Sequence, residues 1–504
     1  MYLIQGCKEK ANNNGRCNVL KNNCYGCCTH LLSRGELDQI HRLSLKILAE
    51  IGIKIEDQIL INKLKEKGCQ KKGNRLLLPA EFIEEMLGEQ EKSHEANNYS
   101  GLKFKNPLSG DEIKFRTGQV YSQPFGTVAS ILDLNSNKPR KVTERDLIEF
   151  IHLQNRLENI DFTGPSVIPE EYSGRLRELK MAETSLRYSR KTFGGVAVSR
   201  SSEVDYIIEL YKIIQDNQPE PIGGLGISPE SPLLYPREIT DIISKVAIAG
   251  IPIKVLVAPI AGLTAPLTIA GSLAQMNASM LAFTVIANLY NPDVILFFCS
   301  RISFPNMMKG YSIWGLPEIG LASTAAVQLA KYYGFFSTVY GISSTSCTID
   351  IQAGYEKAIN TLLPALAGAN ILSGAGSLAS NTLASKEQLV IDNEIMTLVK
   401  RIIARYDINE DTLGFEMLER SIDNGSFISD KHTVKHLRDG EIYHSKLGFD
   451  SFWHEWQESG FLEIAEKATD RIKEILKEEP EDLLTYEQQK AFAKVIRKAE
   501  ESLL

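Results

Sequence analysis

The chain has 504 residues, of which 43% are hydrophobic and 24% are charged. This composition is ordinary for a globular protein, and the length allows a large core and more than one structural unit. The formal net charge of −7, without any long block of lysine and arginine, argues against a nucleic-acid partner, because phosphate binding needs clustered positive charge.

The longest apolar region, residues 263–290, is interrupted by Gln275, Asn277 and Asn288. It is too polar for a lipid-spanning helix, so we predict a buried helix and no membrane association. The first residues, MYLIQGC, lack the basic region and the long apolar run of a signal peptide. We therefore expect a cytoplasmic protein.

Five of the eight cysteines fall within the first 28 residues. Disulfides are not expected in a reducing compartment. Cys17, Cys24, Cys27 and Cys28 could supply four thiolates to a zinc ion or cluster, because Cys24 and Cys27 have the two-residue gap of such sites, but no second pair repeats it. The favoured interpretation of residues 1–34 is an irregular arm with unreactive thiols and no metal.

Residues 35–142 are predicted to form an N-terminal helical and β cap. Apolar residues recur at helical spacing from Leu37 to Ile51, and further helices are expected from Ile59 and from Ala80. Residues 98–140 alternate β-branched and aromatic residues with glycine, proline and asparagine, which indicates antiparallel hairpins.

From residue 143 to residue 430 the pattern is strand then helix, repeatedly, which is typical of a parallel sheet with crossover helices. Strands are expected near IDFTGPSVI, TFGGVAVS, PIGGLGIS, IPIKVLVAP, VILFFCS, FFSTVYGIS and ANILSGAG, with an eighth unit after Arg405. We predict an α/β fold, a (β/α)8 TIM-type barrel with the N-terminal helical and β-hairpin cap and C-terminal helices; a doubly wound sheet is the alternative. Residues 431–504 form the C-terminal helical extension.

Active sites of such barrels lie where the strands end, so polar residues that follow strands are the candidates. Trp314 and Tyr311 offer aromatic faces for a quaternary ammonium group, and Arg301 and Lys309 could clamp a carboxylate. Simple packing of the tryptophan, surface ion pairs and helix caps are the alternatives. The remaining candidates for the substrate site are Glu318, Tyr340, Asp350 and Gln352.

All eight histidines lie outside residues 153–431. This excludes a histidine-based acid–base pair or a histidine-rich metal site within the predicted barrel segment. A catalytic site there must work through carboxylates, through tyrosine or without proton transfer.

Five blocks occur in an order that carries a family resemblance: LKILAEIGIKIED, AGLTAPLTIAGSLAQMNA, WGLPE, DIQAGYEKAINTLLPALAGAN and ASKEQLVIDNEI. From about Leu37 to Lys477 the chain resembles the trimethylamine methyltransferase superfamily. The resemblance implies a (β/α)8 barrel that transfers a methyl group from a methylated amine to the cobalt of a separate corrinoid protein. Trimethylamine enzymes carry pyrrolysine in a loop similar to residues 343–348. This chain has ordinary residues there, so it resembles the non-pyrrolysine branch, which demethylates quaternary amines such as glycine betaine.

Two positions depart from the resembling sequences: Lys309 stands where arginine is frequent, and Ser279 where glutamate is common.

The resemblance implies a corrinoid (cobalamin) carried by a partner protein, a small quaternary amine as substrate, no tightly bound cofactor of the chain's own and a homo-oligomer. A quaternary ammonium leaves as a neutral tertiary amine, which needs no general acid and agrees with the absent histidines. No catalytic residue is predicted. A barrel lyase or hydrolase and a non-catalytic betaine-binding protein remain the alternatives.

Overall fold

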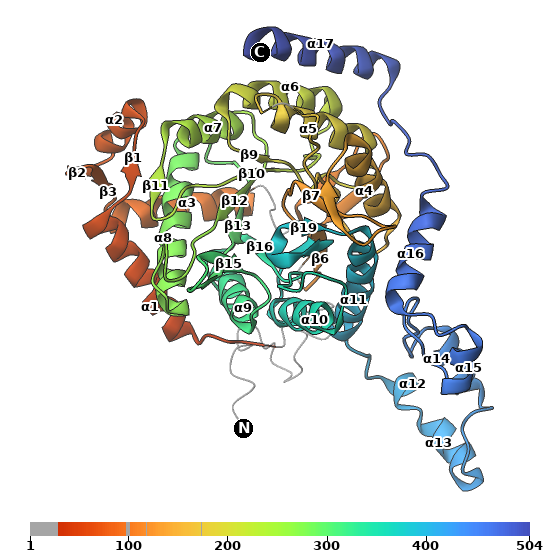
Figure 1. Ribbon diagram of the computed structural model, residues 1–504. Helices are drawn as coiled ribbons and strands as arrows, with labels where there is room; N and C mark the ends of the chain where they lie inside the picture. The colour runs from red at the N-terminus through yellow and green to blue at the C-terminus, as the bar shows by residue number, and fades with distance from the viewer. Residues whose placement is uncertain (1–28, 97–100, 117, 173) are drawn as a thin grey trace.

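The computed structural model describes residues 29–96, 101–116, 118–172 and 174–504 (Figure 1). Cys17, Cys24, Cys27 and Cys28, the residues considered for a metal, lie outside these ranges. The helices expected from Leu37, Ile59 and Ala80 are confirmed as α1 (Arg34–Lys46), α2 (Gln58–Glu66) and α3 (Ala80–Ala96).

A curled parallel sheet of seven strands forms the centre of the protein, in the order β6–β17–β16–β13–β12–β10–β9. Most of its residues are buried on both faces, which explains their continuous apolar runs. The strands are β6 (Tyr121–Pro124), β9 (Ala197–Val198), β10 (Leu225–Ile227), β12 (Ile253–Val257), β13 (Leu296–Ser300), β16 (Phe336–Tyr340) and β17 (Ile371–Ala375).

Helices surround the sheet on its outer side (Figure 1). They follow the strands in the chain, as the strand–helix rhythm predicts. In order they are α6 (Ser201–Gln215), α7 (Arg237–Ile248), α8 (Ile269–Asn288), α9 (Pro317–Tyr332), α10 (Ile351–Leu366) and α11 (Lys386–Ala404).

An irregular segment lies against both edge regions of this sheet. The N–H of Phe162 donates to the carbonyl of Ser122 at 3.0 Å, and the N–H of Thr163 donates to Thr192 at 3.1 Å. The stretch IDFTGPSVI, expected as a strand, therefore lies between β6 and the residues that precede β9. Only single bridges form there, so it is not a regular strand.

The unit expected after Arg405 is not a strand. Beyond β19 (Leu383–Ala384), the regular elements of the described chain are all helical. The neighbour of β17 is instead β6, which comes from the region predicted to form hairpins and pairs in parallel. Its four residues end in proline, so the sequence signal for a central strand was weak. Antiparallel hairpins do form on either side of it: β4 (Lys103–Lys105) with β5 (Glu112–Lys114), and β7 (Ser130–Leu132) with β8 (Pro139–Lys141).

Phenylalanine rings fill the N-terminal end of the sheet. Phe104 and Phe115 of the β4–β5 region pack on Phe297 at the start of β13, with ring centroids 5.9 and 5.7 Å apart. Phe336, the first residue of β16, lies 4.9 Å from Phe115. This apolar plug leaves the C-terminal end of the strands as the end that carries polar side chains.

Helix α8 is long and apolar enough, by length and composition, to cross a membrane, but 78% of its most apolar stretch is buried inside the protein. It packs against α1, α3, α7 and α9. Its polar residue Asn277 is held by hydrogen bonds to Ser44 (2.9 Å) and Tyr333 (2.8 Å). The helix is therefore packed as a core element, as its polar interruptions predicted.

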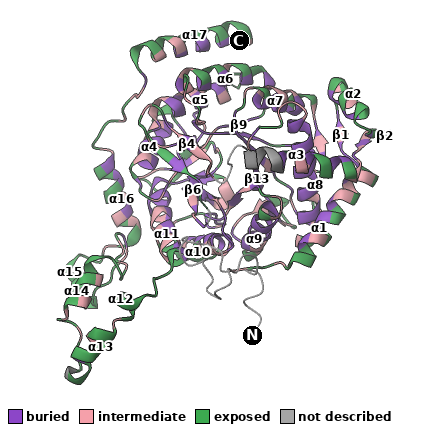
Figure 2. Ribbon diagram, turned by 180° about the vertical axis from the view of Figure 1, so that it is seen from behind, coloured by how far each residue is buried: buried purple, intermediate pink, exposed green. Residues whose placement is uncertain are grey.

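The C-terminal part projects from the body as an arm (Figure 1). It contains α12 (Glu410–Leu413), α13 (Phe415–Ser421), α14 (Lys431–Arg438) and α15 (Trp453–Glu458), before α16 (Ile464–Ile475) packs on α11 and α17 (Tyr486–Leu503) packs on α6. Figure 2 shows the arm as largely exposed. Among its described residues 406–463, Leu447 is the one buried apolar side chain.

A buried ion pair joins the two helices that follow β16 and β17. The Nζ of Lys357 in α10 lies 2.9 Å from the Oδ2 of Asp392 in α11, and both side chains are fully buried. Burial disfavours both charges, so it lowers the pKa of Lys357 and raises the pKa of Asp392. Asp392 also accepts the N–H of Gly376 at 2.7 Å, so the pair fixes the end of β17.

Removing one partner of this pair should destabilise the protein strongly. We expect Lys357→Met to lower the free energy of unfolding by about 3–5 kcal/mol, because it leaves the Asp392 carboxylate buried without a counter-charge. The double variant Lys357→Met/Asp392→Asn keeps an acceptor for Gly376 and should recover most of the loss. Chemical unfolding of the three proteins measures both effects; a double variant as unstable as the single one would contradict the assignment.

Candidate active site

A cavity of about 120 Å³ lies at the C-terminal ends of the strands. Six strands of the seven-stranded sheet contribute to its lining, and Arg301 directly follows the remaining strand, β13. Residues 163–165 of the irregular segment line it as well. Glycines make up much of one wall, and Phe125 and Tyr340 supply aromatic surface. The lining contains two cationic side chains, Lys254 and Arg301, and no aspartate or glutamate.

Lys254 is a cation buried inside the sheet. In β12 the side chains alternate, so Lys254 and Leu256 point toward the cavity and their neighbours point toward the helices. Lys254 is only 3% exposed to solvent. Its ammonium group donates hydrogen bonds to the Oε1 of Gln123 and to the carbonyl of Gly194, both at 2.6 Å. Burial lowers the pKa of Lys254 to about 7. No ion pair to it forms within the described chain.

Arg301 follows β13 and reaches the same cavity. Its Nη1 donates to the carbonyls of Ser300 and Thr338, each at 3.0 Å, and its guanidinium lies 4.5 Å from the centre of the Tyr340 ring. Trp314 packs against Tyr340, with ring centroids 4.6 Å apart. Three predicted residues, Arg301, Tyr340 and Trp314, are thus brought together. Trp314 packs behind Tyr340 and does not line the cavity. This position agrees with the alternative that the tryptophan is a packing residue.

The other predicted residues lie away from the cavity. Tyr311 and Lys309 belong to the exposed hairpin β14 (Phe304–Asn306) and β15 (Tyr311–Ile313), and Glu318 lies in the first turn of α9. Asp350 caps α10 by accepting the N–H of Ala353 at 2.9 Å, and Gln352 donates to Glu356 at 2.9 Å. The helix-cap alternative therefore accounts for Asp350.

Glu356 organises the loop of residues 343–348, a role that the sequence did not indicate. Its carboxylate accepts the hydroxyl of Ser344 and the N–H of Thr345, both at 2.7 Å. The same loop is joined to the loop after β13, because the hydroxyl of Ser343 donates to the carbonyl of Trp314 at 2.7 Å. The loops that follow β13 and β16 are thus joined to each other, although no residue of 343–348 lines the cavity.

The glycines beside the cavity allow strands to approach closely. Gly195 has a φ of +90°, and a Cβ on it would lie 1.8 Å from the carbonyl oxygen of Gly224. A Cβ on Gly223 would lie 2.0 Å from the carbonyl of Phe193. Glycine is therefore needed at these two positions because the neighbouring backbone packs too closely for a side chain. Gly226 also lines the cavity.

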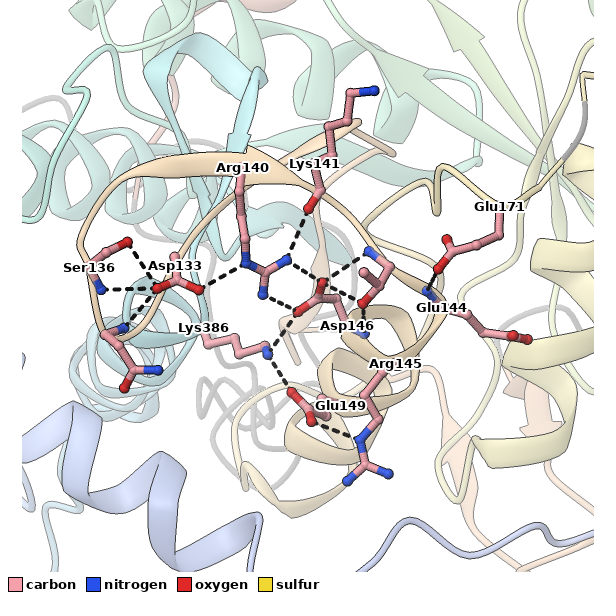
Figure 3. Close-up of polar contacts among 12 residues, drawn as sticks. Asp133, Ser136, Arg140, Lys141, Glu144, Arg145, Asp146, Glu149, Glu171 and Lys386 are labelled. Atoms are coloured by element: carbon pink, nitrogen blue, oxygen red, sulfur yellow. Dashed lines mark hydrogen bonds and ion pairs between the residues drawn. The ribbon is translucent and has the colours of Figure 1, made fainter.

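A charged network anchors the β7–β8 hairpin to two helices (Figure 3). Arg140 of β8 makes a two-pronged contact with Asp146 of α4 (Glu144–Arg156), at 2.6 and 2.9 Å. Lys386, in the first turn of α11, lies 3.1 Å from Asp146. Burial would raise the pKa of Asp146, but hydrogen bonds from Arg140 and Thr143 and the charge of Lys386 hold this pKa well below its usual range.

Lys254, Gln123 and Phe125 were not predicted as site residues. A signal for Lys254 did exist: it is the one charged residue in the apolar strand IPIKVLVAP, and an unpaired lysine is rarely buried without a function. Gln123 and Phe125 belong to β6 and its end, whose place in the sheet was missed.

The fold and cavity define an α/β protein with a small-molecule site at the ends of parallel strands. The chain belongs to the trimethylamine methyltransferase (MTTB) family, whose model matches residues 7–503. The resemblance carried by the five sequence blocks is thereby confirmed.

Two relatives are about equally similar over the same share of the chain. The trimethylamine methyltransferase of Methanosarcina barkeri is 30% identical over 463 residues, covering 89% of this chain and 90% of the relative. The glycine betaine methyltransferase of Desulfitobacterium hafniense (strain Y51) is 30% identical over 459 residues, covering 89% and 92%. The crystal structure of the Methanosarcina barkeri monomethylamine methyltransferase is 13% identical, covers 95% of this chain and 96% of that one, and has a TM-score of 0.47.

Replacing Lys254 by an isosteric apolar residue should stabilise the free protein. Between pH 7 and pH 10 the unfolded chain binds a proton at this lysine that the folded protein lacks, so the stability of the wild type rises with pH in that window. Lys254→Met should therefore raise the free energy of unfolding at pH 7 by about 1 kcal/mol or more, a gain that shrinks toward pH 10. Chemical unfolding at several pH values tests this; a destabilised variant at pH 7 would contradict it.

Proposed function

We propose that this protein transfers a methyl group from a zwitterionic quaternary amine of the betaine class to the Co(I) of a corrinoid protein. The single observation that carries the substrate class is the charge of the cavity, which has two cationic side chains and no carboxylate in its lining. The glycine betaine methyltransferase relative supports the same class.

The charge of the cavity favours a ligand with an anionic group. A cationic amine within about 4 Å of either side chain would be opposed by about 4 kcal/mol at an effective dielectric constant of 20. A betaine carboxylate instead matches Lys254 and the guanidinium fork of Arg301. Its ammonium end would then lie toward the aromatic surface of Phe125 and Tyr340, which suits a methylated cation.

The reaction requires little proton chemistry from this chain. The bond between a methyl carbon and nitrogen breaks with its electron pair left on nitrogen, so the product is a neutral tertiary amine and no proton is added. The corrinoid supplies the nucleophile, Co(I). The side chains of this protein hold the carboxylate, orient the ammonium group toward the opening and exclude water. The described lining contains no histidine, aspartate or glutamate that could act as a general acid.

A corrinoid does not fit inside the cavity, because about 120 Å³ is small even for a drug-sized ligand. It must be presented at the opening. Exposed apolar side chains stand there, after three neighbouring strands: Leu263 after β12, Met307 and Met308 after β13, and Ile351 after β16. Such a rim suits a protein partner. We also propose that the curled sheet acts as a closed barrel, supported by the contacts of residues 161–163 with both of its edges.

One observation favours a second candidate function, a barrel lyase. A buried lysine with a pKa of about 7 can attack a carbonyl substrate and form a Schiff base. Borohydride reduction in the presence of small carbonyl acids would trap such an adduct on Lys254. Methyl transfer gives no trapped adduct, so the two functions separate in one experiment.

Quaternary amines that carry a carboxylate should bind and react better than amines without a carboxylate. We expect glycine betaine to bind at least tenfold more tightly than choline or trimethylamine, measured by calorimetry, and to methylate a Co(I) corrinoid protein in a spectral assay. Lys254→Met and Arg301→Lys should weaken betaine binding roughly 10- to 100-fold, because a hydrogen bond to a charged group contributes about 1.5–3 kcal/mol.

The matched control is Lys191→Met. Lys191 is partly buried, but its ammonium donates to the carbonyls of Leu157 and Ile160, each at 2.5 Å, and it lies outside the cavity. Its replacement should leave betaine affinity unchanged. Equal binding of choline and betaine would overturn the zwitterion assignment, and tight binding without methyl transfer would favour a binding protein.

Binding should also take up a proton above neutral pH. The free Lys254 has a pKa of about 7, and a bound carboxylate raises it, so the betaine must recruit a proton between pH 7 and the higher pKa. We expect the apparent affinity to fall by up to about tenfold per pH unit above pH 7, and to be flat below pH 6. Calorimetry in buffers of different ionisation enthalpy measures the uptake; zero uptake at pH 8 would contradict the role of Lys254.

A further inference from the structure

Two histidines and one aspartate lie together in the projecting arm. His432 and His436 are four residues apart on α14, so they share one face of the helix, and their ring centroids are 4.2 Å apart. Asp411 comes from α12. One ligand atom from each of the three residues lies within 4.8 Å of the others.

The geometry suits a tetrahedral metal ion. Ligands about 2.0–2.1 Å from a tetrahedral Zn²⁺ lie about 3.3 Å from one another. The Nε2 of His436 and the Oδ2 of Asp411 are 3.5 Å apart. That Nε2 atom is buried, and it has no hydrogen-bond partner in the described chain. A buried ring nitrogen without a partner is costly, and a metal ion would satisfy it.

An open side remains for a further ligand. A cavity of about 660 Å³ borders the cluster and is lined by Asp411 and His432. Structural zinc sites use four ligands, and three protein ligands plus water is the usual arrangement beside open space. The histidine pair on one helix turn, joined by a carboxylate from another element, is a common way to bind zinc.

The arm needs such a cross-link. Helices α12 and α14 have 4 and 8 residues, lengths at which isolated helices are not stable in water. With Leu447 as the one buried apolar residue among residues 406–463, the arm has almost no core of its own. Small units of this kind are usually held by metals or disulfides.

Lys435 is the competitor for this site. Its ammonium lies 2.6 Å from the Oδ2 of Asp411, and both side chains are about half exposed, 54% and 52%. An exposed ion pair contributes about 0–1 kcal/mol, so a divalent ion can displace it. His432 also contacts the backbone carbonyl of Asp411 through Nε2 at 2.7 Å, a single hydrogen bond that would be exchanged for the metal or left in place with Nδ1 as the ligand.

We propose that Asp411, His432 and His436 bind a divalent transition-metal ion of the Zn²⁺ class, which joins α12 to α14 and orders the arm. The site is distinct from the substrate cavity, shares no residue with it and does not depend on the proposed methyl transfer.

The test uses the full-length protein, freed of metal by a chelator and titrated with Co²⁺ and Zn²⁺. We expect one Co²⁺ with the visible bands of four-coordinate nitrogen and oxygen ligation, displaced by Zn²⁺. His432→Ala and His436→Ala should each weaken that binding by at least about tenfold. Lys435→Ala should strengthen it, because it removes the cation that competes for Asp411. Zn²⁺ should also slow proteolysis within residues 405–463 in the wild type.

The matched control is His444→Ala, which changes an exposed histidine of the same arm paired with Asp450 at 3.0 Å. It should leave the Co²⁺ spectrum and affinity unchanged. Co²⁺ bound by the N-terminal cysteines would be distinguished from Co²⁺ at this site by thiolate-to-cobalt charge-transfer bands in the near ultraviolet. Binding that shows only those bands, or that is unaltered in both His432→Ala and His436→Ala, would overturn the proposal, as would weaker binding in Lys435→Ala.

Discussion

An ammonium group buried without a counter-ion inside a parallel sheet is the constraint on which the rest of the site depends. Lys254 reaches from β12 across the interior to Gln123 of β6 and to the carbonyl of Gly194. Both acceptors are neutral, so the charge remains uncompensated, and Arg301 adds a second one nearby. A protein keeps such an unfavourable arrangement where a ligand completes it. Gln123 and the backbone of Gly194 hold the Lys254 ammonium in place, and the ring of Tyr340 lies beside the Arg301 guanidinium.

Much of the fold could be predicted from apolar patterning. Six of the seven strand stretches named from the sequence overlap strands of the structure, because buried parallel strands are continuous apolar runs. The same rule failed for β6, which is short, polar and followed by the aromatic Phe125. Its position is set by pairing with β17, a contact between residues about 250 apart that no local pattern reveals.

The candidate site was predicted in part for a related reason. Rules about strand ends located Arg301 and Tyr340, and an aromatic residue in the adjoining loop located Trp314. They could not distinguish a side chain that lines a cavity from one that stacks behind it, since both follow the same strands. Asp350 has the sequence appearance of a ligand and the structural role of a cap. Lys254 lies within a strand, where side chains are expected to pack, although a charge within an apolar run is itself informative.

The phenylalanine plug at the other end of the sheet has a kinetic consequence. Phe104, Phe115, Phe297 and Phe336 fill the N-terminal end of the sheet, and the cavity lies at the other end. Under the proposed function, entry of the small molecule, exit of its product and approach of the protein partner would share one opening. A shared opening would impose an order: the small molecule arrives before the partner covers the opening, and its product departs after the partner has left.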